Sequence, residues 1–338
     1  MSETLPWGWY SDSERLERER SAIFARGWQY AGHTGQVEHA GDRFAARAGH
    51  VPVAVVRDQD GELLAFLNVC RHRGAEVVRE SGNRNTLQCH YHAWTYGLDG
   101  SLIAAPRSER EPGFDPAGLS LVPLRLETLG PLIFVNPEPE GPPLAEVASG
   151  IPEALAAGGI DLDALAFDRR IDYGLEANWK VVIENYLECY HCPTAHPDFS
   201  RAVDVHPDRY ELETADWSSS QHARARNGDG SCQFHFLWPN TRINVFPGGP
   251  NLSIGPAVPS GPDRTEGFFD YFFGSEVPAE EREELIAFDA QVGAEDRELV
   301  ESVQRGMRSG LVEHGRLLPA SERLIAHFQS LVRDAYSA

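Results

Sequence analysis

Histidine and carboxylate side chains that could bind one metal ion concentrate in a short stretch of the chain. His191 and His196 are five residues apart, Glu188 lies three residues before the first of them, and Pro193 lies between them. Two histidines and one carboxylate can hold an iron ion and leave coordination positions open for O2 and water. An isolated histidine pair at this spacing has a structural role as often as it binds a metal. The chemistry therefore depends on a third ligand from elsewhere in the chain.

Candidates for that third ligand lie on a long helix expected over residues 278–308. The apolar face of this helix consists of Phe288, Val292, Leu299, Val300, Val303 and Met307. Asp296 falls on the same face, since it lies four residues from both Val292 and Val300, whereas Glu295 is expected to point away. An ionised carboxylate is costly to bury unless it is paired or binds a metal. Asp289, one heptad earlier, lies on nearly the same stripe, so the pattern alone leaves both aspartates as candidates.

Cysteine and histidine pairs form a second potential metal site nearer the start of the chain. Cys70 and His72 form a Cys-x-His pair, and after sixteen intervening residues Cys89 and His92 form a Cys-x-x-His pair. Two thiolates and two imidazoles on neighbouring loops can converge on one centre. Zinc is one candidate. A [2Fe–2S] cluster, with cysteines on one iron and histidines on the other, fits this order better than the usual Cys-x-x-Cys zinc pattern does.

The other three cysteines, Cys189, Cys192 and Cys232, bring the total to five. An odd number of cysteines in a chain without an export signal predicts no structural disulfide. Each of the three is therefore interpreted as a buried thiol.

Charge and composition exclude several classes of protein. The net charge is −21, and basic side chains are not clustered as phosphate binding requires, so no nucleic-acid partner is expected. The chain has no apolar run long enough for a membrane span, and its first twenty residues do not resemble a signal peptide. Without a span or a signal peptide we expect a cytoplasmic protein, and 338 residues of which 41% are hydrophobic predict two domains.

Short β-rich runs must position the cysteine and histidine pairs. Residues Val51 to Arg57 and Glu62 to Val69 flank a turn, and Pro131 to Val135 form one more apolar strand, which together predict a small antiparallel β domain. An amphipathic helix with Ser13 as its N-cap is expected over 13–26, and the proline-rich run 137–143 begins a linker. The expected division is an N-terminal helical segment (1–42), a β domain with the cluster (43–137), a linker (138–166) and a second domain (167–338).

The second domain must position the two closely spaced histidines. It opens with a strand, Phe167 to Leu175, followed by a helix that Pro193 is expected to end. His191 would then lie on the last turn of that helix, and His196 in the loop beyond it. Further β-rich runs between residues 233 and 273 precede the long helix, so an α+β domain is predicted.

The residues around both potential metal sites resemble the terminal oxygenase (alpha) component of Rieske non-haem iron oxygenases. The resemblance covers nearly the whole chain. It rests on Arg73-Gly74 and Ala93-Trp94-Thr95-Tyr96-Gly97-Leu98-Asp99-Gly100 beside the cysteine pairs, on Asn178-Trp179-Lys180, on the run from Glu184 to His196, and on Ala294 to Gly306.

This resemblance implies a Rieske antiparallel β domain followed by a helix-grip catalytic domain, in which a curved antiparallel sheet surrounds a long helix. It implies a [2Fe–2S] cluster on Cys70, His72, Cys89 and His92, and a mononuclear Fe(II) on His191, His196 and Asp296, so it favours Asp296 over Asp289. Electrons from NAD(P)H would arrive through a separate reductase of the flavin or ferredoxin type. The oxygenase is expected to be a homotrimer, in which the cluster of one subunit serves the iron of its neighbour.

Glu188 gives the resemblance a narrower form. The ring-dihydroxylating branch of the family typically has aspartate before the first histidine. With glutamate at this position, the motif looks like that of the monooxygenase branch, which acts on choline, carnitine or glycine betaine. We expect Glu188 to be a catalytic residue that bridges His191 to His92 of the partner subunit. The predicted reaction is hydroxylation or oxidative dealkylation of a small organic substrate. An aromatic ring-hydroxylating dioxygenase and a non-catalytic Rieske electron carrier or zinc-stabilised binding protein are the alternatives.

Overall fold

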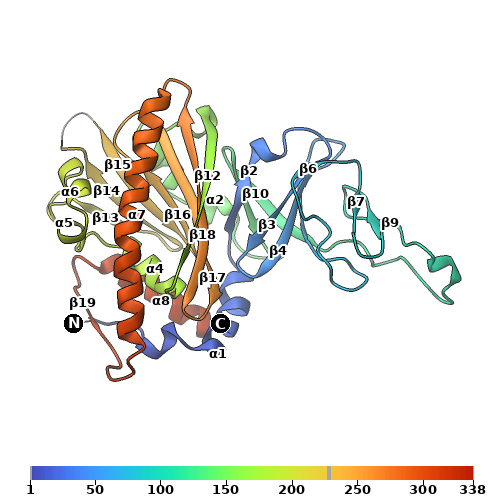
Figure 1. Cartoon of the computed structure of the whole chain (residues 1–338), viewed down its shortest axis with the longest axis horizontal. Coiled ribbons are helices and arrows are strands. Elements are labelled where there is room, and N and C mark those ends of the chain that lie inside the picture. Colours follow the sequence, from blue (N-terminus) through green and yellow to red (C-terminus); the bar gives the residue numbers. More distant parts are fainter. Residues whose placement is uncertain (1, 227–229, 338) are drawn as a thin grey trace. The chain divides into compact units, whose positions relative to one another are not determined.

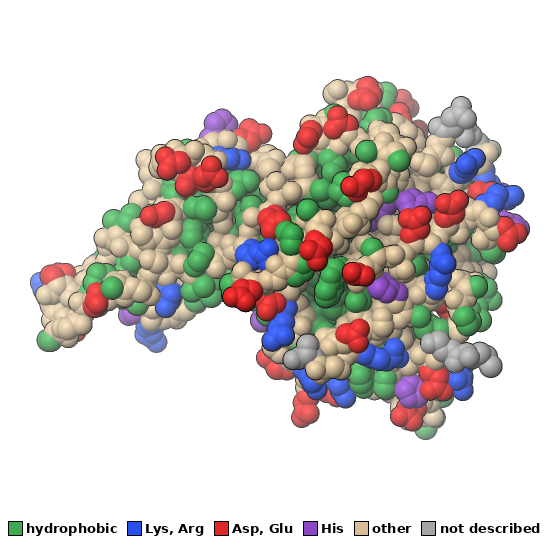
Figure 2. Space-filling model, turned by 180° about the vertical axis from the view of Figure 1, so that it is seen from behind, with side chains coloured by type: hydrophobic (Ala, Val, Ile, Leu, Met, Phe, Trp, Pro, Cys, Tyr) green, Lys and Arg blue, Asp and Glu red, His purple; other side chains and the backbone are tan. Residues whose placement is uncertain are grey.

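The computed structural model describes residues 2–226 and 230–337, which divide into two compact units. The β unit is Phe24–Leu144, and the α+β unit combines Met1–Ile23 with Ala145–Ala338. Figure 1 shows that the first is built of strands and that the second combines a sheet with helices. Acidic residues outnumber basic ones by 51 to 30, and they are spread over the face drawn in Figure 2.

Two antiparallel sheets form the β unit. The larger has the order β2-β11-β10-β5-β4-β3-β6, and the smaller the order β7-β8-β9. The strands of the larger sheet are β2 (Gln29–His33), β3 (Asp42–Ala48), β4 (Val51–Arg57), β5 (Leu63–Leu67), β6 (Gly82–Asn83), β10 (Pro123–Leu129) and β11 (Leu132–Asn136). Those of the smaller sheet are β7 (Leu87–Gln88), β8 (Thr95–Tyr96) and β9 (Leu102–Ala104).

Strand β4 separates two hydrophobic clusters because successive side chains of a strand point to opposite faces. Val53 and Val55 belong to one cluster, whereas Ala54 and Val56 belong to the other. The second cluster also contains Cys70 and Cys89 of the two loops that carry the Cys and His pairs, together with Trp94 and Tyr96. The core of the β unit therefore anchors those loops.

The boundaries of the units differ from the expected ones. The β unit begins at Phe24 and not at residue 43, because β2 pairs with β11. All five residues of β2 are buried, so it lacks the alternation that marks a strand in sequence. The expected linker contains helices α2 (Leu144–Val147) and α3 (Ile151–Ala157), and α3 belongs to the α+β unit.

A seven-stranded antiparallel sheet with a long helix beside it dominates the α+β unit. Its order is β12-β18-β17-β16-β15-β14-β13. The strands are β12 (Leu165–Leu175), β13 (Glu211–Thr214), β14 (Ser218–Arg224), β15 (Ser231–Leu237), β16 (Thr241–Val245), β17 (Asn251–Gly261) and β18 (Arg264–Gly274). Helix α7 (Ala279–Met307) runs across this sheet in Figure 1. A short ladder pairs β1 (Ser2–Glu3) with β19 (Arg316–Leu317).

The inward face of α7 departs from the predicted one at its C-terminal end. Val300 and Gln304 are buried, whereas Val303 is 44% exposed. Gln304 is buried because its side chain accepts a hydrogen bond from the N–H of Asn178 (2.7 Å) and donates one to the carbonyl of Tyr10 (3.0 Å). Gln304, whose amide is hydrogen-bonded, thus lies on the inward face of α7, where the apolar pattern had placed Val303.

The shorter helices are α1 (Ser13–Glu19), α4 (Trp179–Tyr186), α5 (Cys192–Ala195), α6 (Pro197–Ala202) and α8 (Arg323–Ser337). Asp12, and not Ser13, caps α1, because its carboxylate accepts from the N–H groups of Glu14 and Arg15. No helix of the described residues 2–226 and 230–337 is long and apolar enough to cross a membrane.

Helix α4 is held by a buried polar cluster. Glu19 of α1 accepts hydrogen bonds from Lys180 Nζ (2.5 Å), the Trp179 indole (2.7 Å) and the Tyr336 hydroxyl (2.8 Å). Glu19 and Lys180 are both fully buried, and a buried ion pair is tolerated when further hydrogen bonds satisfy it, as here. These contacts fix the helix that leads into the histidine segment.

Candidate metal centres

Two loops of the β unit carry the cysteine and histidine pairs, and both close with the same main-chain hydrogen bonds. The bonds are Gly74 N to Cys70 O (2.9 Å), Cys70 N to Ala75 O (2.8 Å), Ala93 N to Cys89 O (3.0 Å) and Cys89 N to Trp94 O (2.8 Å). Gly74 and Ala93 turn their loops with φ angles of 80° and 56°, in the left-handed region. Each cysteine is thus positioned by its own loop.

The thiols and the imidazoles of this site form two separate pairs. Cys70 and Cys89 are buried, and Cys70 Sγ lies 3.3 Å from the Tyr96 hydroxyl. Burial raises the pKa of the Cys89 thiol, and the nearby Cys70 thiol raises it further. His72 and His92 are exposed, with ring centroids 4.6 Å apart. Paired thiols and paired imidazoles suit a binuclear cluster whose two irons take different ligands.

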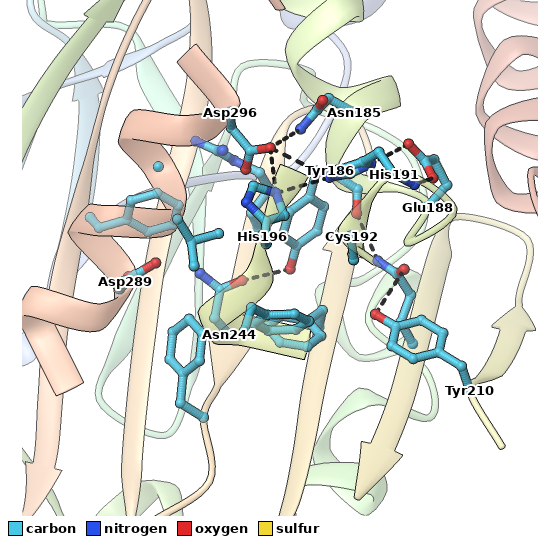
Figure 3. A pocket seen from close by; sticks show the side chains of 18 residues that line it. Asn185, Tyr186, Glu188, His191, Cys192, His196, Tyr210, Asn244, Asp289 and Asp296 are labelled. Carbon is cyan, nitrogen blue, oxygen red and sulfur yellow. Dashed lines mark hydrogen bonds and ion pairs between the residues drawn. The ribbon is translucent and has the colours of Figure 1, made fainter. Parts of the chain in front are cut away.

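Three side chains of the α+β unit bring their metal-binding atoms within 4.8 Å of one another: His191, His196 and Asp296. The two Nε2 atoms are 3.1 Å apart, and Asp296 Oδ1 lies 3.0 Å from Nε2 of His196 and 3.5 Å from Nε2 of His191. Figure 3 shows both imidazoles turned toward the carboxylate, which projects from α7. This donor set suits a divalent metal ion with open coordination positions.

The local structure around the two histidines is not the one predicted. Helix α4 ends five residues before His191, which directly precedes α5, and His196 lies between α5 and α6. The prediction that His191 lies on the last turn of the preceding helix is therefore wrong. Pro193 lies in the first turn of α5, where a missing N–H costs nothing, so it helps to begin a helix and does not end one.

A disulfide joins Cys189 to Cys192 and encloses His191 between them. The prediction of no structural disulfide is therefore wrong for this pair. The turn between α4 and α5 brings the two Cα atoms to 4.9 Å, within the range that a disulfide spans. Cys232 is a buried free thiol, as predicted, and burial raises its pKa to about 12.

A separate side chain orients each of the three potential ligands. Glu188 Oε1 contacts Nδ1 of His191, and Glu295 Oε2 lies 2.7 Å from Nδ1 of His196. Carboxylates on Nδ1 favour the tautomer that leaves Nε2 free to bind a metal. The prediction that Glu295 points away is wrong, because His196 approaches α7 from the side and meets two consecutive carboxylates.

The amide of Asn185 donates a hydrogen bond to Asp296 Oδ1 at 2.7 Å and orients the third ligand. Asn185 is a site residue to which the sequence assigned no role. Its place in the run from Glu184 to His196 is a signal, but only the fold shows that α4 packs against α7 at this point.

Electrostatics within the group favour a cation. Burial lowers the pKa of His191, but hydrogen bonds to Asp296 and Glu188 outweigh it and raise the pKa to about 9. Burial acts to raise the pKa of Asp296, yet hydrogen bonds from His191 and His196 hold it well below its ordinary value. The carboxylate is therefore ionised at neutral pH and draws positive charge to the group.

Asp289 has different partners. Its carboxylate accepts hydrogen bonds from the Tyr271 hydroxyl (2.8 Å) and from Ser253 Oγ (3.3 Å). Burial raises its pKa to about 6, with hydrogen bonds from the same two residues opposing the rise. The structure thus groups Asp296, and not Asp289, with the two histidines.

The three-ligand group faces a cavity inside the α+β unit. Two adjoining hollows of about 110 Å³ and 270 Å³ share Asn185, Tyr186, Arg242, Phe269, Asp289, Gly293 and Asp296. Other aromatic residues of the walls are Tyr173, Phe199, Tyr210, Phe234, Phe246 and Tyr271. Hydrogen bonds fix part of this wall, since the Tyr186 hydroxyl lies 2.8 Å from Asn244 Oδ1 (Figure 3).

Two family models match the chain, and together they cover most of it. One is the Rieske [2Fe-2S] domain, over residues 27–123, and the other is the ring hydroxylating alpha subunit (catalytic domain), over residues 162–338. The second match includes the three-ligand group, and the first includes both cysteine loops.

Curated relatives match along nearly the whole length of the chain. The carnitine monooxygenase oxygenase subunit of Acinetobacter baumannii is 35% identical over 350 residues, which cover 97% of this chain and 94% of that protein. The chloroplastic choline monooxygenase of Atriplex hortensis is 32% identical, over 96% of this chain and 76% of that protein.

Solved structures agree with these relatives. A quaternary ammonium Rieske monooxygenase in complex with L-carnitine superposes with a TM-score of 0.88 at 33% identity, over 99% of this chain and 96% of that one. A naphthalene 1,2-dioxygenase from Rhodococcus shares the fold with a TM-score of 0.82 at 20% identity, over 99% of this chain and 94% of that one.

Proposed function

We propose, from the premise that this chain belongs to the Rieske non-haem iron oxygenases, that it is a monooxygenase of a quaternary ammonium compound. Membership confirms the predicted fold and the oxygenase class. It also confirms the predicted cofactors, a [2Fe–2S] cluster and a mononuclear iron, with electrons supplied by a separate reductase. A reductase, O2 and an organic substrate are accordingly its partners.

The donor atoms of the chain fit both groups. We assign the cluster to Cys70, His72, Cys89 and His92, whose buried thiols and exposed imidazoles pair as a two-iron cluster requires. We assign the mononuclear iron to His191, His196 and Asp296. When bound, the cluster supplies single electrons and the iron activates O2 for insertion into a C–H bond of the substrate.

Side chains outside the proposed ligand set hold the ligands in position. Glu188 and Glu295 hold the two imidazoles through Nδ1, and Asn185 holds the carboxylate of Asp296. The Phe199 ring lies edge-on to His196 with ring centroids 6.4 Å apart and packs against Phe234, so one side of the site is apolar.

Glu188 is also assigned the bridge to the cluster of a neighbouring subunit in a homotrimer. Its Oε1 contacts His191, and its Oε2 accepts the backbone N–H groups of Tyr190 (2.5 Å) and His191 (3.2 Å). A carboxylate has about four acceptor positions, so a further imidazole N–H can still bind. His92 of the partner subunit is the donor we propose, because His92 is exposed on its loop.

The observation that carries the substrate proposal is the aromatic wall of the cavity beside the three-ligand group. Aromatic faces attract quaternary ammonium groups through their negative quadrupole. The two relatives described above, one named for carnitine and one for choline, are 35% and 32% identical to this chain, which supports the same substrate class.

Oxygen uptake by the purified protein with a matched reductase tests this proposal. Trimethylammonium compounds should give O2 consumption coupled to product, whereas aromatic acids should give little or uncoupled consumption. Coupled turnover of neutral aromatic substrates alone would favour the aromatic ring-hydroxylating alternative, and a protein that binds only zinc would contradict the oxygenase class.

A further inference from the structure

A buried arginine lies in the cavity wall without a carboxylate partner. Arg242, the second residue of β16, is 9% exposed, and its side chain lines both hollows beside the three-ligand group. Its Nε has no hydrogen-bond partner in the part of the chain that the structure describes, and one Nη donates to the Tyr173 hydroxyl. Within residues 2–226 and 230–337, no carboxylate forms an ion pair with it.

Such a position is costly for a permanent positive charge. A guanidinium stays protonated in proteins and loses much of its hydration when buried. The rings of Phe269, Tyr173 and Tyr186 lie 4.6, 5.3 and 5.8 Å from its carbon and offset part of that cost. Aromatic faces cannot accept hydrogen bonds from the remaining N–H groups as an anion does. The guanidinium therefore lacks an anionic partner within the described chain.

Asp289 is the obvious internal counter-ion, but its geometry does not fit that role. It lies in the wall of the same cavity, and the guanidinium charge acts to lower its pKa, yet its Oδ2 accepts from Tyr271 and Ser253 and no ion pair joins it to Arg242. Of the other acidic groups beside the cavity, Glu188 and Asp296 contact the histidines, and Asp172 of β12 is exposed and forms no ion pair with Arg242 among the residues that the structure describes. The positive charge of Arg242 therefore remains available inside the cavity.

We infer that Arg242 is a specificity-determining residue that binds a carboxylate of the substrate. The inference rests on the proposed function and narrows it: the substrate is a zwitterion with a quaternary ammonium group and a carboxylate, and not a cationic alcohol. The ammonium end faces the aromatic wall near the histidines, and the carboxylate reaches the guanidinium.

Wild-type holoenzyme gives the first test, because it needs no variant. γ-Butyrobetaine, its methyl ester and choline are compared by calorimetric binding under anaerobic conditions and by coupled O2 uptake. The ester keeps the trimethylammonium group and lacks the negative charge. We expect the acid to bind about 100-fold more tightly than the ester, the size of effect seen for a buried charge pair. Equal affinity of acid and ester would overturn the inference while leaving the proposed function intact.

Variants of Arg242 give the second test. Arg242→Gln should weaken binding of the acid about 100-fold and change binding of the ester less than about 3-fold, whereas Arg242→Lys should recover part of the loss for the acid. Thermal unfolding of each variant checks that it folds. Asp289→Asn is the matched control, since it removes a charge from the same cavity and should not weaken binding of the acid.

Outcomes separate the two ideas. If Arg242→Gln weakens acid and ester equally, or if Asp289→Asn reproduces its effect on the acid, Arg242 has only a structural role and the inference is wrong. If the wild type gives coupled turnover with none of the three compounds, the proposed function itself fails, and the inference fails with it.

Discussion

The two metal centres of this protein are assembled over very different distances along the chain. In the β unit, each loop holds a cysteine and a histidine a few residues apart and closes with its own main-chain hydrogen bonds. In the α+β unit, His196 and Asp296 are 100 positions apart, and the side chains that orient the proposed ligands come from α4, from the turn after it and from α7. Loops define the first site, whereas tertiary packing of α4 against α7 defines the second.

Because the two sites are built differently, different substitutions should weaken metal binding at each. A loop that positions its ligands by main-chain bonds tolerates changes to its neighbours but cannot replace a lost thiol. A site that is assembled by side chains from several elements should weaken gradually as its supporting residues are removed, because each support can be lost separately.

The largest expected effect is the loss of the cluster in Cys89→Ala. No other thiol among residues 2–226 and 230–337 lies in its loop, so the variant should lose the reduced-state EPR signal and the visible absorption completely, together with all turnover. The mononuclear iron should remain, measured as iron content after the cluster is lost. A normal EPR signal in this variant would refute the assignment of the cluster.

Asp296→Ala should abolish hydroxylation and lower bound mononuclear iron while the cluster spectrum stays normal. Removing one of three ligands from a partly buried site should reduce metal affinity at least about 100-fold, more than the loss of a supporting residue would. Asp289→Ala is the comparison, because its carboxylate accepts from Tyr271 and Ser253. If Asp289→Ala loses the iron and Asp296→Ala keeps it, the choice between the aspartates is reversed.

Glu188→Ala should keep the cluster, the mononuclear iron and the trimer but lower turnover at least about 10-fold. The reason is that the cluster of one subunit would no longer deliver electrons efficiently to the iron of its neighbour. Glu295→Gln is the matched control, since Glu295 supports His196 as Glu188 supports His191 but is not part of the proposed bridge.

Single-turnover experiments separate the two glutamates. Cluster oxidation, normalised to bound iron, should be slow in Glu188→Ala and normal in Glu295→Gln. Wild-type rates of cluster oxidation and product formation in Glu188→Ala would exclude the bridge.

Features that depend on residues close together in the chain could be predicted from the sequence. Spacing alone predicted Cys70 and His72 as ligands, β4 has the predicted bounds, and α7 lies within one residue of its predicted ends. Asp296 could be placed on the inward face of α7 by helical period, but the choice over Asp289 needed the family resemblance.

Tertiary contacts decided what the sequence missed. β2 is buried on both faces and shows no alternation, and Gln304 is buried only because Asn178 and Tyr10 satisfy its amide. Arg242 places a charge within a buried strand, which is a signal, yet its cavity is visible only after residues of β12, β18 and α7 come together.

Glu184 gives a smaller effect that depends on pH. Burial raises its pKa to about 7 from an ordinary value of 4.5, against hydrogen bonds from Tyr10 and Gln329. Between these two pH values the folded protein holds a proton that the unfolded chain releases. The stabilisation that this carboxyl provides is therefore complete below about pH 4.5 and is lost as the pH rises through about 7.

Glu184→Gln should remove this dependence while keeping an acceptor for the Tyr10 hydroxyl at 2.6 Å. As the pH rises from 5 to 8, the free energy of unfolding of the variant should increase by roughly 1–3 kcal/mol relative to that of the wild type. Urea unfolding at both pH values measures the difference. Parallel pH profiles for the variant and the wild type would show that Glu184 titrates normally.

The smallest effects should appear in the two cluster loops, where the same left-handed position is filled by glycine in one and alanine in the other. An L side chain in this region costs about 1 kcal/mol, so Ala93→Gly should stabilise the β unit by up to that amount. Gly74→Ala should destabilise it by a similar amount, and only through the backbone, because an added Cβ would meet no atom within 4 Å. Thermal unfolding of the holoprotein should show Tm shifts of a few degrees in opposite directions, with unchanged EPR spectra. Shifts of the same sign would mean that the side chain of Ala93 contributes contacts that outweigh its conformational strain, and that the two loops are not equivalent.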